Sequence, residues 1–532
     1  MTIAITASGA AAEAVASVVP TLVGDLVASG ITAQDPSLWG PEAEQEAAQR
    51  LGWAEAITVS AELVPGIVAL RHRLARKGLT RFVLAGMGGS SLAPEVITRT
   101  YGVDLTVLDS TEPGQVLDAL NDDLEHTVLI VSSKSGSTVE TASQRATFEK
   151  AFVDAGFTDL ADRIVVVTDP GSPLDASAQE AGYVVFHADP TIGGRYSALS
   201  AFGLVPSGLA GADIEELLAE ADAVTVELAQ DRIDNPGLVL GAVLAGTKPL
   251  RDKIAIVESG THIRGFADWA EQLIAESTGK LGRGLLPVVI GRDAPELSEN
   301  LHDVQVIRLV GSTEETREVA RGEVEISGSL GGQILLWEYA VAVAGRLLGI
   351  NPFDQPDVES AKVATRALLD ERPEPVSPAF VVDGVEVRAA GGVATGDSLE
   401  SAVAGLLASL TDDGYVSIQA YVDRVRNSEL VRLRSALAAR TKRPVTFGWG
   451  PRFLHSTGQY HKGGPANGVF LQITQTPRVD LEIPGSPFTF GALIAAQAAG
   501  DARVLSEHGR PVLTLTVGDV QAALPAILSA LR

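Results

Sequence analysis

A cluster of hydroxyl side chains stands between a predicted strand and a predicted helix, in the segment SSKSGST at residues 132–138. The polar residues at its centre are Ser133, Lys134, Ser135, Ser137 and Thr138. A helix start needs only one capping hydroxyl, so the surplus requires another explanation. Hydroxyls, main-chain N–H groups at a helix N-terminus and an ammonium together suit a phosphate group. The segment therefore predicts a phosphate-binding loop.

A glycine-rich loop, GMGGSS at residues 86–91, also follows a predicted strand. Glycines allow main-chain N–H groups to approach an anion, which makes Gly89 and Ser90 candidate binding residues. The loop departs from the dinucleotide fingerprint because Ser91 stands in the third glycine position, and it lacks the lysine of a P-loop. Taken alone, it fits an anion site or a turn that requires glycine.

Two charged side chains complete the candidate chemistry. Arg195, in GGRYS at residues 193–197, could hold an anion or stabilise charge that develops in a transition state. The alternative is a surface arginine in a turn. Glu276 stands where the helical pattern of WAEQLIAESTGK breaks, and it could act as a general base. The alternative is a solvated glutamate at a helix end.

Metal and thiolate chemistry find no support in the sequence. The chain has no cysteine, which excludes disulfides and thiolate catalysis, and it has no HExxH motif and no acidic calcium loop. The eight histidines show no spacing typical of metal ligands. We therefore expect neither a metal nor an organic cofactor.

The elements that must position these loops alternate between short β-branched runs and amphipathic stretches. The predicted strands are 82–86, 105–110, 127–133, 164–169, 184–188, 253–259, 286–291, 304–310, 415–422, 445–450, 468–474 and 512–517. Strands that alternate with helices of this length indicate parallel strands with crossover helices, hence a doubly wound α/β sheet. In such sheets ligands bind where strands end and helices begin, which is where the loops above lie.

Four segments follow from this pattern. Residues 1–60 are alanine-rich and predict a helical lead-in, and residues 61–212 and 213–372 predict two similar α/β domains. Residues 373–532 continue in α/β style, and we expect them to complete or extend the second domain.

Composition narrows the function classes. The 41 basic and 67 acidic side chains give a net charge of −26, which argues against a nucleic-acid partner. We expect a locally positive cleft on this acidic surface, formed by Lys134, Arg195, Lys280 and Lys362. The first basic residue is Arg50, so neither a secretory nor a mitochondrial leader fits, and no long uncharged apolar stretch predicts a membrane span. We therefore expect a cytoplasmic protein with no membrane partner.

Taken in order, the motifs resemble the phosphosugar isomerase (SIS) fold and, more narrowly, the glucose-6-phosphate isomerase family. The segments that carry the resemblance are GMGGSSLAPE at 86–95, SSKSGSTVET at 132–141, GGRYS at 193–197, ESTGK at 276–280 and GINPFDQPDVESAK at 349–362. The resemblance implies that both predicted α/β domains are SIS-type domains with doubly wound parallel sheets. It also implies reversible isomerisation of glucose 6-phosphate and fructose 6-phosphate through a cis-enediol.

One motif departs from the family order. The ring-opening histidine of the family lies in a segment like HSMGQ before the NPFDQ motif, whereas here HSTGQ begins at His455, well after Lys362. This order is similar to the isomerase half of actinobacterial transaldolase–isomerase fusions. A further (β/α)₈ barrel of about 250 residues does not fit in the chain, so we expect a stand-alone isomerase. His461 and His302 remain alternatives to His455.

The resemblance assigns roles residue by residue. Glu276 would be the base, Arg195 would stabilise the enediolate, His455 would move protons in ring opening, and Lys362 would assist at the ring oxygen. The residues that would bind substrate are Gly89, Ser90, Ser133, Lys134, Ser135, Ser137, Thr138 and Gln355. In the family the histidine comes from a neighbouring subunit, so the resemblance also implies a homodimer.

Three other functions stay open at this point. A dual-specificity enzyme would also act on mannose 6-phosphate, because the pocket residues that read the configuration at C2 are not placed. A sugar-phosphate sensor would use the same fold without turnover, but it does not explain a base together with an arginine. A purely structural protein leaves the hydroxyl-rich loop unexplained.

Overall fold

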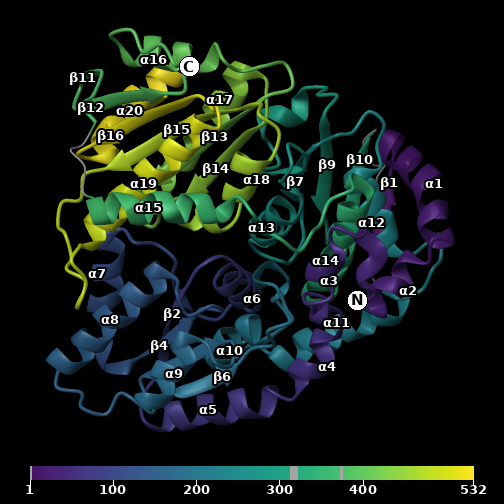
Figure 1. Ribbon diagram of the computed structural model, residues 1–532, viewed down its shortest axis with the longest axis horizontal. Coiled ribbons are helices and arrows are strands. Elements are labelled where there is room, and N and C mark those ends of the chain that lie inside the picture. Colours follow the sequence, from purple (N-terminus) through teal and green to yellow (C-terminus); the bar gives the residue numbers. More distant parts are fainter. Residues whose placement is uncertain (1–2, 312–321, 372–375) are drawn as a thin grey trace.

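Three β-sheets, each with its own helices, make up the molecule (Figure 1). The structure, a computed structural model, describes residues 3–311, 322–371 and 376–532, and the side chains of residues 358–362 and 370–371 also fall outside the description. In Figure 1 the first sheet lies in the blue lower part, the second in the teal part at the right, and the third in the green and yellow part at the top. The predicted α/β class with parallel sheets is confirmed.

The first sheet has five parallel strands in the order β3-β2-β4-β5-β6. They are β2 (Arg81–Gly86), β3 (Thr106–Leu108), β4 (Thr127–Ser132), β5 (Ile164–Thr168) and β6 (Val184–His187). Their helices are α6 (Leu92–Tyr101), α7 (Pro113–Asn121), α8 (Val139–Asp154), α9 (Pro173–Glu180) and α10 (Ala201–Ala210). The β4 and β5 strands are buried along their whole length, which explains their continuous β-branched runs.

The second sheet has the order β1-β10-β9-β7-β8. Its strands are β1 (Ala4–Ala7), β7 (Lys253–Glu258), β8 (Leu286–Ile290), β9 (Val304–Leu309) and β10 (Glu323–Ser327). Its helices are α11 (Ile214–Leu228), α12 (Pro236–Ala245), α13 (Phe266–Thr278) and α14 (Leu330–Leu348). Here β1 runs antiparallel to β10 at the edge, while the other pairs are parallel.

We predicted a helical N-terminal segment, but the segment also contains a β-strand. It begins with β1 and continues through α1 (Gly9–Gly24), α2 (Val27–Thr32), α3 (Glu44–Ala47), α4 (Ala56–Ala61) and α5 (Val64–Arg76). The β1 strand forms the edge of the second sheet and pairs with β10, whose main-chain groups on that side would otherwise be open. Trp53 is fully buried and stacks on Tyr196, with ring centroids 5.2 Å apart, so the segment docks on the core.

The C-terminal part forms a third sheet, with the order β11-β12-β16-β15-β13-β14, instead of completing the second one. Its strands are β11 (Phe380–Val382), β12 (Val385–Ala390), β13 (Tyr415–Tyr421), β14 (Val445–Trp449), β15 (Gly468–Gln475) and β16 (Val512–Val517). Its helices are α16 (Leu399–Leu407), α17 (Arg432–Thr441), α18 (Gly458–Gly463), α19 (Phe490–Glu507) and α20 (Val520–Leu531). We expected residues 373–532 to complete or extend the second domain, and their strands form a sheet of their own and do not join the second sheet. The alternation of strands in the sequence does not say which sheet a strand joins.

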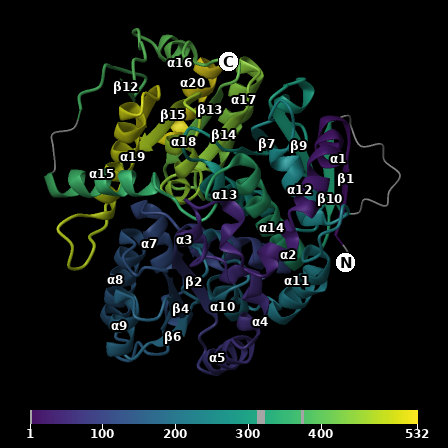
Figure 2. The ribbon, with the colours of Figure 1, turned by 45° about the vertical axis from the view of Figure 1, so that its right-hand side comes forward.

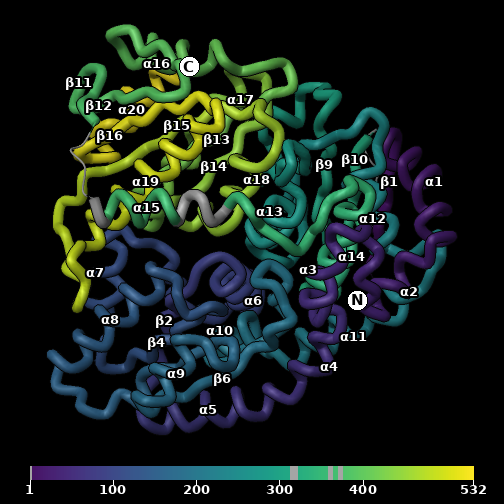
Figure 3. The backbone as a smooth tube through the Cα atoms, viewed as in Figure 1, coloured from purple at the N-terminus to yellow at the C-terminus, as the bar shows by residue number. Residues whose placement is uncertain are grey.

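The third sheet packs on both of the others. Ile483, Phe490 and Leu493 share a hydrophobic cluster with the first sheet, and Tyr460 and Phe470 share one with β7 and β8. The α15 helix (Val358–Glu371) packs against α19, and Figures 2 and 3 show it running along the boundary between the first and third sheets. Loops from all three sheets therefore converge at the centre of the molecule.

No single helix among the described residues has both the length and the apolar character needed to cross a membrane. Two consecutive helical segments, Gly52–Ala61 and Val64–Arg76, would together be long and apolar enough by length and composition, and they are bent by 52° relative to each other.

A buried network of ion pairs joins the second and third sheets. We expect it to contribute to the free energy of unfolding. Asp303 forms ion pairs with two cations. Nη1 of Arg443, just before β14, lies 3.2 Å from its Oδ1, and Nζ of Lys253, on β7, lies 3.0 Å from its Oδ2. Burial acts to raise the pKa of Asp303, but the hydrogen bond from Arg443 and the charge of Lys253 hold it below its ordinary value.

We expect Asp303→Asn to lower the free energy of unfolding by about 3–5 kcal/mol at pH 7, because it removes the carboxylate that faces the buried Arg443 and leaves Lys253 with Asp252 alone. Because the folded pKa is depressed, this stability is present above the unfolded pKa of about 4 and is lost as the pH falls through the folded value. Urea unfolding at pH 7 and pH 3.5 measures both effects, with the exposed Asp412→Asn as the control. Equal stability of the two variants at pH 7 would contradict the prediction.

Candidate active site

Glu276 lies near the C-terminal end of α13, and its position decides between the two sequence interpretations. The residue is only 5% exposed, so the alternative of a solvated glutamate at a helix end is wrong. One carboxylate oxygen lies 3.6 Å from Nη1 of Arg195, and the other accepts from Nε2 of Gln272 at 3.4 Å. Burial raises the pKa of Glu276, while Arg195 and Gln272 act against that rise. A raised pKa makes the ionised carboxylate a stronger base.

Arg195 is held in place from several sides rather than exposed in a turn. It lies in a 3-10 helix, η5 (Gly194–Tyr196), and is 4% exposed. Its nitrogens donate to Oγ of Ser277 (2.9 Å), Oε1 of Gln355 (3.1 Å), and the main-chain oxygens of Pro352 (2.7 Å) and Asp354 (3.0 Å). The guanidinium charge is therefore fixed beside the Glu276 carboxylate.

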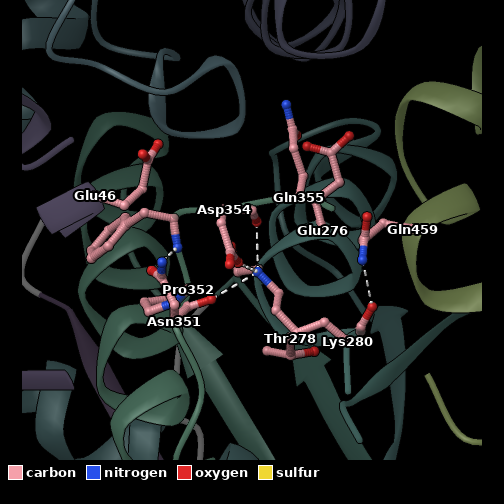
Figure 4. A network of polar contacts seen from close by, with 12 residues as sticks. Glu46, Glu276, Thr278, Lys280, Asn351, Pro352, Asp354, Gln355 and Gln459 are labelled. Carbon is pink, nitrogen blue, oxygen red and sulfur yellow. Dashed lines mark hydrogen bonds and ion pairs between the residues drawn. The ribbon is translucent and has the colours of Figure 1, made fainter. Parts of the chain in front are cut away.

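The segment 351–357 after α14 contacts both this arginine and Lys280, and Figure 4 shows its contacts with Lys280. Nζ of Lys280 donates to the main-chain oxygens of Asn351 (2.7 Å) and Asp354 (2.6 Å) and to Oδ1 of Asp354 (2.6 Å). Burial and the charge of Arg195 lower the pKa of Lys280 to about 8, against the opposing charge of Asp354. Because both cations bind the same main-chain oxygen, Arg195 and Lys280 lie close together, as the predicted positive cleft requires.

Gln355 and Lys362 belong to the motif at the end of this segment. Gln355 is exposed and accepts from Arg195, and Figure 4 shows its side chain and that of Glu276 pointing to the same side. Lys362 lies on α15, and its side chain falls outside the described residues. Its predicted role at the ring oxygen stays a prediction.

His455 reaches the same place from the third sheet. It ends the 3-10 helix η8 (Arg452–His455), and its Nε2 lies 3.0 Å from Oε1 of Glu140 on α8. Its main-chain oxygen accepts from Nε2 of Gln272, at 2.9 Å, the same side chain that contacts Glu276. Gly88 leaves room for this approach, since a Cβ there would come within 2.8 Å of that oxygen. His455 therefore meets the base through Gln272, and it does so within one chain.

The two alternative histidines lie elsewhere. His461 is buried against the third sheet, where its ring nitrogens contact the hydroxyls of Tyr415 (2.9 Å) and Ser417 (3.3 Å) on β13. Burial holds the pKa of His461 well below its ordinary value, so this imidazole is a neutral part of the core. His302 is exposed just before β9. Of the three candidates, His455 is the one that the fold brings to Glu276.

Glu140 is a functional candidate that our sequence interpretation missed. Its buried carboxylate accepts from Nε2 of Gln497, at 2.7 Å, as well as facing His455. It stands two positions after Thr138, in the first turn of α8 and inside the STVET motif. The sequence offered only a glutamate close to the predicted phosphate loop, whereas its burial and its contact with His455 are visible in the structure alone.

The hydroxyl-rich loop connects the end of β4 to the start of α8, where the N-cap residue Thr138 makes no side-chain capping hydrogen bond. The Ser133 hydroxyl contacts that of Thr138 at 3.1 Å and accepts from the Gly136 N–H, and the hydroxyls of Ser135 and Ser137 lie 2.9 Å apart. Ser135 and Ser137 are exposed, so their hydroxyls are open to a ligand.

Lys134 does not add free charge to this loop. Its Nζ forms an ion pair with Asp169, at 2.8 Å, and donates to the main-chain oxygen of Pro190 at 3.2 Å. The loop therefore presents neutral hydroxyls and main-chain groups, with its ammonium already paired.

The glycine-rich loop lies against the turn that carries Arg195. A Cβ on Gly89 would come within 1.9 Å of the main-chain oxygen of Gly194, so only glycine fits there. Ser90, its buried neighbour, is part of the 3-10 turn η3 (Gly88–Ser90). Gly89 lies against the turn that carries the arginine and Ser90 follows it in the chain, and their binding role stays a prediction.

Among the residues that the structure describes, no group of three or more His, Cys, Asp or Glu side chains could hold a metal ion.

Comparisons with known proteins identify the family to which the chain belongs. The family model described as phosphoglucose isomerase matches residues 71–281. A glucose-6-phosphate isomerase from Rubrobacter xylanophilus is 30% identical over 366 residues, which cover 56% of this chain and 84% of that protein. A probable glucose-6-phosphate isomerase from Natronomonas pharaonis is 31% identical over 335 residues, which cover 53% of this chain and 78% of that protein. The chain belongs to the glucose-6-phosphate isomerase family.

Solved structures share the fold of this family member. A hypothetical protein from Thermus thermophilus has a TM-score of 0.57 at 24% identity, over 69% of this chain and all of that one. A glucose-6-phosphate isomerase from Chlamydia trachomatis has a TM-score of 0.51 at 21% identity, over 65% of this chain and 79% of that one.

The effect of Arg195 on the pKa of Glu276 predicts that the pH dependence of kcat/KM shifts when the arginine is replaced. Removal of the Arg195 charge takes away the strongest influence that lowers the pKa of Glu276. We therefore expect the acidic limb of kcat/KM to lie at higher pH in Arg195→Gln than in the unchanged protein, whatever the loss in rate. Initial rates of sugar-phosphate isomerisation between pH 5 and pH 9 measure the limb. A limb that stays in place or moves to lower pH would show that the titrating group is not Glu276.

Proposed function

We propose that this chain catalyses the reversible isomerisation of glucose 6-phosphate and fructose 6-phosphate, with Glu276 as the general base. The observation that carries the proposal is the buried pair of Glu276 and Arg195, joined through Gln272 to His455 and Glu140. Membership of the glucose-6-phosphate isomerase family supports the choice of substrate.

Glu276 takes the proton from C2 of the open-chain aldose as the C1 carbonyl becomes an enediolate. The same carboxyl group returns the proton to C1, and the hydroxyl proton on O2 moves to O1, so that the carbonyl ends at C2. The negative charge of the intermediate lies on the oxygens, where the fixed guanidinium of Arg195 stabilises it. A raised pKa of Glu276 favours proton abstraction, because a stronger base accepts the proton more readily.

The phosphate group binds at the start of α8. Ser133, Ser135, Ser137 and Thr138 supply hydroxyls, and the 16-residue α8 adds the partial positive charge of its N-terminus. Main-chain groups at Gly89 and Ser90 extend the binding surface toward Arg195. This contact, remote from the reacting carbons, orients C1 and C2 at Glu276.

His455 moves the proton between the ring oxygen and O1 when the sugar ring opens. Glu140, 3.0 Å away, fixes the direction of the imidazole. Lys362 assists at the ring oxygen, and Gln355 contacts the sugar hydroxyls.

The catalytic groups in this proposal all come from one chain. The homodimer and the cytoplasmic location that we expect from the sequence remain part of the proposal. The homodimer is not needed to supply His455, because Glu140 and His455 meet within the chain.

We expect Glu276→Gln to lower kcat by at least ~100-fold, because an amide of the same shape cannot accept the proton. Formation of glucose 6-phosphate from fructose 6-phosphate is followed with an NADP-linked glucose-6-phosphate dehydrogenase. The control is Glu271→Gln, one and a half turns earlier on the same helix, which should keep the activity within about 3-fold.

Two results would contradict this assignment. If Glu276→Gln and Glu271→Gln behave alike, the base lies elsewhere. If the unchanged protein shows no activity although fructose 6-phosphate raises its melting temperature, the site binds the sugar phosphate without turnover.

The single-chain site also predicts how activity depends on concentration. We expect the specific activity to stay constant through a dilution series that takes the protein from fully dimeric to fully monomeric, as followed by light scattering. A loss of specific activity that tracks dissociation would show that a second copy completes the site.

A further inference from the structure

Arg452 and His455 leave the same turn in the same direction. They are the first and last residues of η8, and in a 3-10 helix side chains three positions apart lie above one another. Both side chains reach the first sheet: His455 faces Glu140, and Arg452 contacts Glu95 on α6 and Asp109 after β3. The turn that presents the histidine is therefore tied to the first sheet at its beginning as well as at its end.

Arg452 belongs to a cluster whose buried part is two arginines and two carboxylates, and the half-exposed Arg99 also pairs with Oε1 of Glu95, at 3.1 Å. Its Nη2 donates to Oε2 of Glu95, and its Nε lies 3.0 Å from Oδ2 of Asp109. Arg424, which follows β13, takes the other two oxygens, with Nη1 at 3.1 Å from Oε1 of Glu95 and Nε at 3.6 Å from Oδ1 of Asp109. Asp109 is completely buried, and the other three side chains are nearly so. The alternation of charges makes each arginine the counter-charge of both carboxylates.

The loop that carries Asp109 reaches His455 by a second route. The Thr111 hydroxyl donates to Oε1 of Gln497 at 2.6 Å, and Nε2 of Gln497 donates to Glu140 at 2.7 Å. Glu140 in turn faces His455. The loop at 109–111 thus fixes the start of η8 through Arg452 and the partner of the imidazole through Gln497.

We propose that Arg452 is a positioning residue that holds the His455 imidazole on Glu140 for ring opening. The inference rests on the proposed function. Gln272 fixes the His455 carbonyl and Arg452 fixes the start of the turn, so the two together fix the direction in which the ring points. Proton transfer depends steeply on such placement, because a displacement of about 1 Å reduces a rate by about 100-fold.

Arg424 provides the matched control. It contacts the same two carboxylates, but it stands on the loop after β13 and not on the turn that carries His455. Arg452→Met and Arg424→Met remove the same charge from the same cluster, and both replace a buried arginine with a side chain of comparable length. A difference between them reports on the turn and not on the charge.

The experiment compares a substrate that must open its ring with one that has none. We measure solvent deuterium incorporation by NMR for fructose 6-phosphate and for 5-deoxyfructose 6-phosphate, which lacks the hydroxyl that closes the furanose ring. We expect Arg452→Met to lower the rate on fructose 6-phosphate by at least ~30-fold and on the open-chain analogue by less than about 3-fold. Arg424→Met should lower both rates by less than about 3-fold.

Two kinetic results would overturn the proposal: equal losses in the two variants, or equal losses on the two substrates in Arg452→Met. If Arg452→Met does not fold, Arg452→Lys takes its place. It keeps the charge but lacks the fork that bridges Glu95 and Asp109, so it should show the same substrate selectivity.

A second readout does not depend on turnover. The imidazole ¹⁵N signals of His455, assigned with His455→Gln, should shift in Arg452→Met and stay in place in Arg424→Met. Failure of the unchanged protein to act on either sugar phosphate would overturn the proposed function alone, and the ¹⁵N shift would still decide the role of Arg452. Unshifted signals in Arg452→Met would overturn the positioning role even in an active enzyme.

Discussion

The contact between the Arg195 guanidinium and the segment 352–355 is the interaction on which the active site depends. The arginine donates to main-chain oxygens of that segment and to Ser277, next to the base. It therefore joins a turn after the first sheet, the helix α13 of the second sheet and the segment that follows α14. A buried cation needs several acceptors to offset its desolvation, and once these are in place its direction is no longer free. The charge that would stabilise an enediolate is thus oriented before any substrate arrives.

Directional polar contacts also position His455, which the third sheet carries. His455 is brought to a site built by the other two sheets, and Glu140, its partner, is 315 positions away in the chain. Hydrophobic clusters attach the third sheet to both neighbours, but apolar contacts do not fix the direction of a single ring. Directional contacts do, and they are found on both sides of His455, at Glu140 and at Gln272.

Much of this was predictable from the sequence, for identifiable reasons. The parallel strands were found because strands buried on both faces need continuous β-branched runs, as in β4 and β7. Glu276 and Arg195 were found because they stand in short motifs next to helix starts and ends. The edge strand β1 and its neighbour β10 were missed, since both are short and carry a weak pattern, and the identity of such a strand depends on its partner. Glu140 was missed because its role is set by His455 and Gln497, which no local pattern connects to it.

The paired state of the charges explains how a protein with a net charge of −26 can hold an anion. Lys134 is neutralised by Asp169, and Lys280 by Asp354, so neither offers a free charge to the phosphate. What remains at the start of α8 is a set of neutral hydroxyls and N–H groups, whose attraction is short-ranged and directional. The long-range repulsion from the acidic surface is screened over ~8 Å at physiological salt. In the proposed function, selection of the phosphate then depends on contact geometry at the loop, while Arg195 keeps its charge for the reacting carbons.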